Sequence, residues 1–252
     1  MLSMREVREN FLLDQVYLSN IELYYTAIPV NNNLIKIDGE EQHHIIDVMR
    51  HNENDIIYAT HGTGVIYKSA ITAFNKNEII CEIVEEFNYE DKFTHIWFCI
   101  PRLKAPERFE FALEKCVELG ITNFIVFDSM RTVAKGEKID RWQKILVSAM
   151  KQSLRAWLPK ISYVKNMSHL IHNNAHLVLF EQNAKISYQD FLRTNEELLV
   201  SDNFYFIFGP EGGFDEIEIK ELGKCEIVKL TDNRLRSETA IISAASILST
   251  CF

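Results

Sequence analysis

The spacing of hydrophobic positions changes near residue 92, and the two parts of the chain predict different structures. From Leu23 to Phe87, alternating or β-branched runs separated by turn residues predict short strands, for example over Asn33–Ile37, Asp55–Ala59 and Glu78–Val84. One helical stretch, Glu41 to Arg50, interrupts them. Short strands at this spacing predict a small β-barrel.

After His95 the pattern becomes an alternation of strand and helix. Ile96–Ile100 has the composition of a buried strand, and Pro106 opens a helix whose apolar residues recur at helical spacing until Gly120. A second amphipathic helix is predicted from Arg141 to Trp157. Further strands are predicted over Asn123–Phe127, Leu177–Phe180, Phe204–Phe208 and Ile227–Leu230. Alternation of this kind predicts an α/β domain with a mostly parallel sheet covered by helices.

These patterns divide the chain into three predicted segments. Residues 1–20 carry mixed charge with weak periodicity and are expected to form an N-terminal extension. Residues 21–92 form the predicted barrel, and residues 93–252 form the α/β domain. The polar stretch from Glu85 to Lys92 marks the boundary between them.

Composition predicts a globular protein of the cytoplasm. Hydrophobic residues make up 47% of the 252 residues, and no apolar run approaches the roughly 18 residues of a membrane span. The start lacks the layout of a secretory signal, and five cysteines far apart in the sequence predict reduced thiols. His169, His172 and His176 have helical spacing but no cysteine or carboxylate beside them, so we expect no metal site.

Charge is distributed unevenly along the chain. A net charge of −9 argues against a protein that coats nucleic acid nonspecifically. Residues 1–100 hold 7 basic and 16 acidic residues, residues 101–165 hold 13 and 7, and residues 166–252 hold 7 and 13. The basic excess is therefore confined to the middle segment, whose cations form either an RNA-facing patch or ordinary solvated helix faces.

The densest chemical signal is a pair of loops, Phe208–Phe214 and Leu235–Ala240. Asp215 and Glu218 have the spacing of a capping box, so the glycine turn joins a strand end to a helix start, where open α/β sheets bind ligands. Ser237 can cap the final helix in the same way. A phosphate-binding loop would need a lysine after its last glycine, and no G-x-G-x-x-G follows a strand. A ligand cradle made of backbone groups and a plain structural turn both remain open.

The two loops, read as Gly209-Pro210-Glu211-Gly212-Gly213-Phe214 and Leu235-Arg236-Ser237-Glu238-Thr239-Ala240, resemble the paired signature of the RsmE family of 16S ribosomal RNA (uracil-N3) methyltransferases. The resemblance extends to the helix from Arg108 to Gly120, to the basic helix holding Arg141 and Arg155, and to His43, Val48 and Arg50 in the barrel. It covers the chain from about Leu23 to its end.

This resemblance implies a SPOUT-type domain with a trefoil knot near its carboxyl end, a PUA-like barrel, a homodimer and S-adenosylmethionine as the cofactor. The implied substrate is a uridine in 16S ribosomal RNA, free or in the small ribosomal subunit. Carried onto matching positions, the implied cofactor site consists of Phe180, Glu181, Gly209, Pro210, Glu211, Gly212, Gly213, Leu230, Leu235, Ser237, Thr239 and Ala240.

Methylation at uracil N3 requires removal of a proton and stabilisation of negative charge on the ring oxygens. Arg236 is the expected stabilising cation, with Glu211 or Glu238 as proton acceptor or orienting group. Glu238 and Arg236 have a simpler interpretation too, as a favourable charge at a helix start and its ion-pair partner. Candidate phosphate contacts in the basic segment are Arg102, Lys104, Arg108, Lys151 and Arg155.

The chain departs from the family pattern just before the second loop. Thr231 stands where the family commonly has a glycine, and Asn233 stands where it has an arginine. These departures support an alternative function, a noncatalytic RNA-binding or ribosome-assembly protein on the same fold. A third interpretation keeps a SPOUT methyltransferase but assigns it another RNA base.

Overall fold

The computed structural model describes residues 18–170 and 175–252, and the chain divides into two compact units. The first unit runs to Asp91 and takes in Met150–Leu158, whereas the second comprises Lys92–Ala149 and Pro159–Phe252. Residues 150–158, which the sequence assigns to the α/β domain, are thus part of the first unit. Most of the predicted N-terminal extension, residues 1–20, lies outside the described residues.

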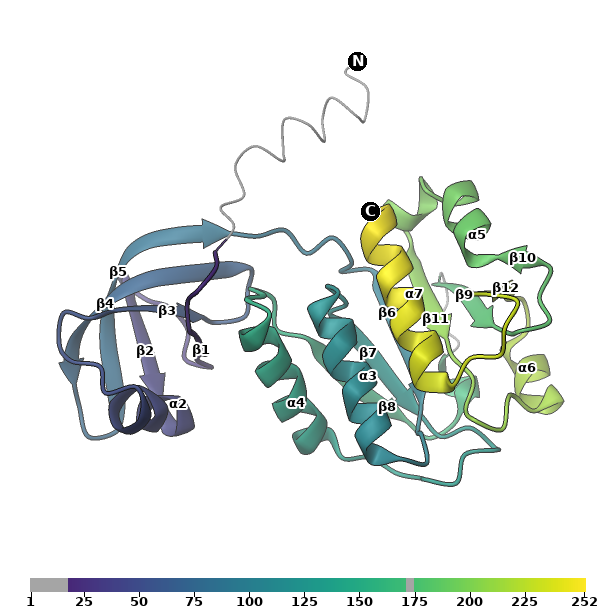
Figure 1. Ribbon diagram of the computed structural model, residues 1–252, viewed down its shortest axis with the longest axis horizontal. Coiled ribbons are helices and arrows are strands. Elements are labelled where there is room, and N and C mark those ends of the chain that lie inside the picture. Colours follow the sequence, from purple (N-terminus) through teal and green to yellow (C-terminus); the bar gives the residue numbers. More distant parts are fainter. Residues whose placement is uncertain (1–17, 171–174) are drawn as a thin grey trace, which may run out of the picture. The chain divides into compact units, whose positions relative to one another are not determined.

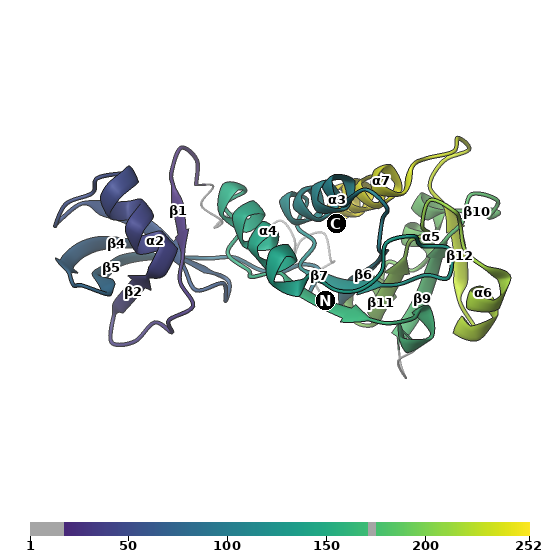
Figure 2. The same cartoon turned by 90° about the horizontal axis from the view of Figure 1, so that it is seen from below.

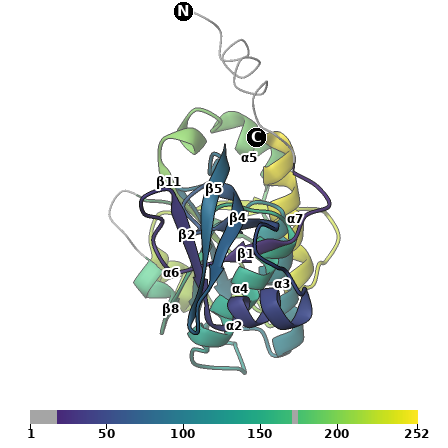
Figure 3. The ribbon, with the colours of Figure 1, turned by 90° about the vertical axis from the view of Figure 1, so that its left-hand side faces the viewer.

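The first unit is a curled five-stranded sheet (Figure 1). Its elements are β1 (Leu23–Tyr25), β2 (Leu34–Asp38), α2 (Gly39–His43), the π-helix η1 (His44–Val48), β3 (Ile56–Thr60), β4 (Val65–Phe74) and β5 (Glu78–Asn88). The strand order is β1-β3-β4-β5-β2, with β1 and β3 parallel and the other pairs antiparallel. Figure 3 shows β2, β5 and β4 as neighbours, with α2 beside them. The predicted helix from Glu41 to Arg50 thus begins earlier, at Gly39, and ends at Val48.

The turn between β3 and β4 packs closely against the segment Met150–Leu158. A Cβ atom at Gly62 would collide with Leu158, and one at Gly64 would collide with the Trp157 ring, so both positions require glycine. The Leu158 N–H donates to the Gly62 carbonyl at 2.9 Å, and the Trp157 indole donates to the Tyr89 carbonyl at 2.8 Å. These contacts explain why the segment belongs to the first unit.

The second unit is a seven-stranded parallel sheet with helices on both faces. Its elements are β6 (Ile96–Pro101), α3 (Pro106–Glu118), β7 (Asn123–Phe127), α4 (Ile139–Gln152), β8 (Lys160–Val164), η2 (Met167–Leu170), β9 (Ala175–Phe180), β10 (Ile186–Ser187), α5 (Tyr188–Thr194), η3 (Leu198–Val200), β11 (Asn203–Ile207), α6 (Glu216–Leu222), β12 (Glu226–Lys229) and α7 (Ser237–Cys251). Figure 2 shows α3 and α7 side by side on one face and α6 on the other. This is the predicted SPOUT-type parallel sheet.

Strand order in this sheet is β10-β12-β9-β11-β6-β7-β8. β11 therefore lies between β6 and β9, which brings the carboxyl ends of β12, β9, β11 and β6 next to one another. Alternate residues face opposite sides, so Cys99 and Ile207 pack with Leu222 of α6, and Phe98 faces the other side. In open α/β sheets this edge, outside the carboxyl ends of the strands, is where ligands bind.

Three elements of this unit, α4, β8 and α5, differ from the sequence prediction. Helix α4 ends at Gln152 and does not reach Trp157, because Leu154 takes a left-handed φ of 53° that interrupts the helix. The edge strand β8 and the short helix α5 lacked a clear periodic signal.

In the described part of the chain, no helix is long and apolar enough to cross a membrane.

Candidate cofactor and substrate pocket

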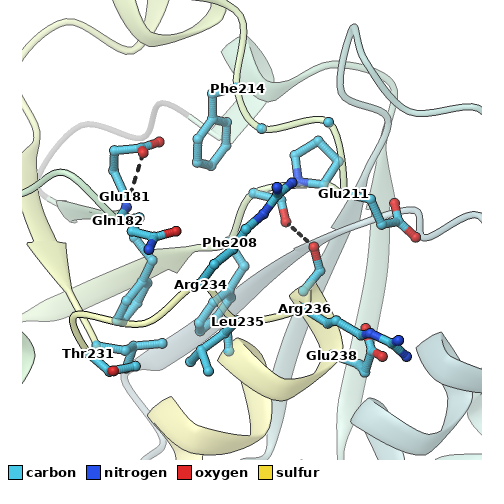
Figure 4. Close-up of a pocket in the computed structure, with 18 of the residues that line it drawn as sticks. Glu181, Gln182, Phe208, Glu211, Phe214, Thr231, Arg234, Leu235, Arg236 and Glu238 are labelled. Carbon is cyan, nitrogen blue, oxygen red and sulfur yellow. Dashed lines mark hydrogen bonds between the residues drawn. The ribbon is translucent and has the colours of Figure 1, made fainter.

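A cavity of about 750 Å³ opens at the carboxyl ends of β9, β11 and β12. Its walls come from three loops, 180–182, 208–214 and 230–236, together with the start of α7 and one residue of α3 (Figure 4). The lining residues are Arg108, Phe180, Glu181, Gln182, Phe208, Gly209, Pro210, Glu211, Gly212, Gly213, Phe214, Leu230, Thr231, Asn233, Arg234, Leu235, Arg236, Ser237, Glu238 and Ala240. The two loops of the sequence signature therefore meet at one site.

The glycine turn is a rigid wall of this cavity. Gly213 has a φ of 70°, and its N–H donates to the Pro210 carbonyl at 2.9 Å, which closes the turn. Helix α6 then begins with the predicted capping box, in which the Asp215 and Glu218 side chains each accept a hydrogen bond at the helix start. The turn is thus held by its own backbone and by the helix that follows it.

The second loop is attached to the first through Ser237. The Ser237 hydroxyl donates to the Gly209 carbonyl at 2.7 Å, and the cap position of α7 is taken by Arg236. The prediction that Ser237 caps the final helix was therefore wrong, since its hydroxyl joins the two loops instead. Thr231 and Asn233 are the positions where this chain departs from the family pattern. The Asn233 N–H donates to the Thr231 hydroxyl at 3.0 Å, so these residues form a compact turn in the wall of the cavity.

Stacked aromatic rings form an apolar part of the pocket. Phe180 and Phe208 lie parallel, with ring centroids 4.6 Å apart and an interplanar angle of 6°. Tyr188 packs edge-on against Phe180 from the protein interior. A flat apolar ligand would find side chains of matching character here.

Charged groups gather where α3 and α7 meet the glycine turn. Glu238 lies 3.6 Å from Arg108, with a side chain only 12% exposed, and its Oε2 atom is buried without a hydrogen-bond partner among the described residues. The exposed Glu211 accepts a hydrogen bond of 3.0 Å from the Lys104 backbone N–H. Arg236, also exposed, sits beside them at the start of α7 (Figure 4). The structure therefore brings together all three candidates for catalysis.

Most of the predicted cofactor residues line this cavity, and Thr239 does not. Thr239 is the exposed residue of the first turn of α7. Seven lining residues were predicted neither as cofactor residues nor as catalytic residues, namely Arg108, Gln182, Phe208, Phe214, Thr231, Asn233 and Arg234. Phe208 precedes the signature and Phe214 is its last residue, so their position beside the glycine turn was the available signal. Arg108 had been assigned to RNA, because nothing in the sequence links α3 to the start of α7.

The five candidate phosphate contacts are divided between the two units. Lys151 and Arg155 belong to the first unit, where Lys151 forms an ion pair with Glu41. Lys104 and Arg108 lie at the pocket in the second unit.

Arg102 is buried, which overturns its assignment as a phosphate contact. The residue is only 4% exposed, and its guanidinium lies 4.9 Å from the Trp142 ring centroid and 5.4 Å from that of Phe109. Burial lowers the pKa of this guanidinium below its ordinary value, and the negative charge of Asp128 opposes the shift. Arg102 thus packs as a cation against two rings that also contact each other, with centroids 5.2 Å apart.

Among the described residues, no group of histidine, cysteine and carboxylate side chains could hold a metal ion. His176 instead lies 3.0 Å from Asp202, and His172 falls outside the described residues. All five cysteines are free, with Cys81, Cys99 and Cys116 buried and Cys251 exposed.

Comparisons with known proteins agree with this fold. A family model described as an RNA methyltransferase domain matches residues 90–249, and an RNA methyltransferase PUA domain matches residues 37–84. Fold and site thus define an RNA methyltransferase with a PUA domain. The relatives narrow this class, and the chain belongs to the ribosomal RNA small subunit methyltransferase E (RsmE) family.

Two relatives and one solved structure illustrate the similarity. Ribosomal RNA small subunit methyltransferase E of Bacillus subtilis is 30% identical over 226 residues, which cover 84% of this chain and 88% of the relative. The protein of the same name from Aquifex aeolicus is 28% identical over 235 residues, covering 90% and 99%. A crystal structure of ribosomal RNA small subunit methyltransferase E from Neisseria gonorrhoeae, bound to S-adenosyl methionine, shares the fold with a TM-score of 0.79 and 23% identity, covering 92% and 98%.

Proposed function

We propose that this protein transfers a methyl group from S-adenosylmethionine to N3 of a uridine in 16S ribosomal RNA. The observation that carries the proposal is the single cavity where Gly209–Gly213 and Leu235–Ala240 meet, in a chain of this family. Mass spectrometry of nucleosides from small subunits incubated with the protein and the cofactor tests it. Formation of 3-methyluridine supports the proposal, and a different methylated nucleoside would assign another base.

The residues of the cavity match S-adenosylmethionine in chemistry. The Phe180–Phe208 stack and Leu230 offer an apolar surface for an adenine ring. The lining side chains carry three arginines and three glutamates, and no lysine is present among the described lining residues. Carboxylates suit the positive charges of an ammonium and a sulfonium, whereas a phosphate site would require an excess of cations. The bound cofactor supplies the methyl group.

Glu238 is the better placed of the two candidate proton acceptors. Glu238 lines the cavity and its Oε2 atom has no hydrogen-bond partner in the described structure, which supports it as the acceptor of the N3 proton of uracil. Glu211 already accepts the Lys104 backbone N–H, which supports an orienting role. Arg236 is the proposed cation that stabilises negative charge on the uracil oxygens.

Lys104 and Arg108 are the proposed phosphate contacts nearest the pocket, with Lys151 and Arg155 as contacts on the first unit. RNA of the small subunit, free or assembled, is the proposed partner, which places the protein in the cytoplasm. The PUA domain supports an interaction with RNA.

We further propose a homodimer formed through α7. The last fourteen residues of the chain carry no charged side chain, and Ile242 and Ile247 are only half-buried. An uncharged helix face of this kind is suited to a second copy of the chain, and a monomer in light scattering would contradict the proposal. The trefoil knot implied by the resemblance stays a prediction.

A further inference from the structure

We infer that Glu218 and Arg131, which lie outside the pocket, are positioning residues that set the shape of the glycine turn and thereby the affinity for the cofactor. The inference rests on the proposed function. Glu218 belongs to α6, and Arg131 belongs to the loop that follows β7. Together they connect this loop to the turn that walls the cavity.

Glu218 is buried, only 4% exposed, and its side chain joins the start of α6 to the loop after β7, two segments that are far apart in the sequence. Its Oε2 atom accepts the Asp215 N–H at 3.1 Å and the Ser129 hydroxyl at 2.9 Å, and its Oε1 atom accepts the Met130 N–H at 2.8 Å. The capping box accounts for only the first of these bonds. The other two hold the loop after β7 against the start of α6, and they give the buried carboxyl group further hydrogen-bond donors.

Arg131 extends this connection to the glycine turn itself. Its guanidinium donates to the Gly212 carbonyl at 3.3 Å and to the Asp215 carboxylate at 3.2 Å. The two segments also pack closely, since a Cβ atom at Gly212 would lie 3.3 Å from the Arg131 Cβ atom. Arg131 therefore holds the carbonyl end of the peptide that joins Gly212 to Gly213.

The other end of the same peptide is held within the turn. The Gly213 N–H donates to the Pro210 carbonyl at 2.9 Å. Because a peptide unit is planar, a hydrogen bond at each end fixes its orientation, and both flanking residues are glycines that would otherwise adopt many conformations. Loss of the Arg131 contact would leave only one end fixed. The fraction of molecules with a competent pocket wall would then fall, and the apparent dissociation constant would rise by the same factor.

Two variants test the inference in the full-length protein. Arg131→Met removes both hydrogen bonds from a half-exposed side chain while keeping its aliphatic stem, so folding should be preserved. Glu218→Gln keeps the shape but offers one acceptor oxygen, so either the Met130 N–H or the Asp215 N–H loses its acceptor. Glu221→Gln, on the exposed side of the same helix, is the matched control.

Calorimetry with S-adenosylmethionine should show a dissociation constant raised about tenfold in both variants and unchanged in the control. Hydrogen exchange at the Gly213 amide should accelerate, and turnover at saturating cofactor should stay within about twofold of the parent. Arg131→Lys should lie between Arg131→Met and the parent, because one ammonium group replaces a fork of two donors.

Unchanged affinity and unchanged exchange at Gly213 in Arg131→Met would overturn the inference. If the parent protein itself failed to bind the cofactor, the proposed function would fail. The exchange rate at Gly213 would still report whether Arg131 holds the turn, so the two failures are distinguishable.

Discussion

The Ser237 hydroxyl donates a hydrogen bond of 2.7 Å to the carbonyl oxygen of Gly209. This contact joins the two halves of the family signature, which are 28 residues apart in the sequence. It also fixes the start of α7, and with it Arg236 and Glu238, relative to the glycine turn. The cofactor wall and the proposed catalytic groups are thus parts of one hydrogen-bonded structure.

Replacing Ser237 by alanine should loosen this connection. Loss of one largely buried hydrogen bond costs about 1 kcal/mol, so the dissociation constant for S-adenosylmethionine should rise roughly fivefold. Calorimetry measures the change, and Ser243→Ala on the same helix serves as the control. Equal affinity in both variants would show that Ser237 contributes nothing to the site.

Glu238→Gln and Glu211→Gln should separate proton transfer from orientation. If Glu238 accepts the N3 proton, its amide variant should lose about a hundredfold or more in turnover while binding the cofactor normally. Glu211→Gln should lose less, because an amide oxygen can still accept the Lys104 N–H. Single-turnover methylation of small subunits measures both rates. A larger loss in Glu211→Gln would reverse the assignment.

Arg102→Ala should change the stability of the protein, whereas Lys104→Ala should change its binding to RNA. Arg102 is buried against the rings of Phe109 and Trp142, so its removal should lower the free energy of unfolding by about 2 to 3 kcal/mol without changing the salt dependence of RNA affinity. Lys104→Ala should leave unfolding unchanged and reduce the salt slope by about one ion. Urea unfolding and RNA titrations at several salt concentrations give the two values. An RNA defect confined to Arg102→Ala would contradict the structural role.

The sequence was informative about local features and silent about distant contacts. The periodic strands, the capping box of Asp215 and Glu218 and the residues of the two loops were predicted, because each signal lies within a few consecutive positions. The insertion of β11 between β6 and β9 could not be predicted without family resemblance, since strand order depends on contacts far apart in the chain. Burial of Arg102 was missed for the same reason, since Trp142 lies 40 positions away in the sequence.

Asp215 should make stability depend on acid pH. Its pKa is lowered chiefly by the hydrogen bond from the Ile217 N–H and further by Arg131, so the folded state favours the ionised form. The ionised Asp215 side chain therefore adds to the free energy of unfolding. This stabilisation is fully present above the unfolded-state pKa of about 3.9 and is lost as pH falls through the lower folded-state pKa. Urea unfolding between pH 2 and 7 should show a smaller acid-side decline for Asp215→Asn than for Glu216→Gln. Identical pH profiles of the two variants would show that Asp215 does not cause the loss of stability in acid.

The proposed reaction is the methylation of uracil N3 of 16S ribosomal RNA, with S-adenosylmethionine as the methyl donor. Its most direct test is mass spectrometry of nucleosides from unmodified small subunits and from free 16S RNA, each incubated with the protein and the cofactor carrying a deuterated methyl group. We expect deuterated 3-methyluridine with the parent protein. With Arg236→Ala we expect no deuterated 3-methyluridine. Cofactor binding without any labelled nucleoside, or label on another base, would contradict it.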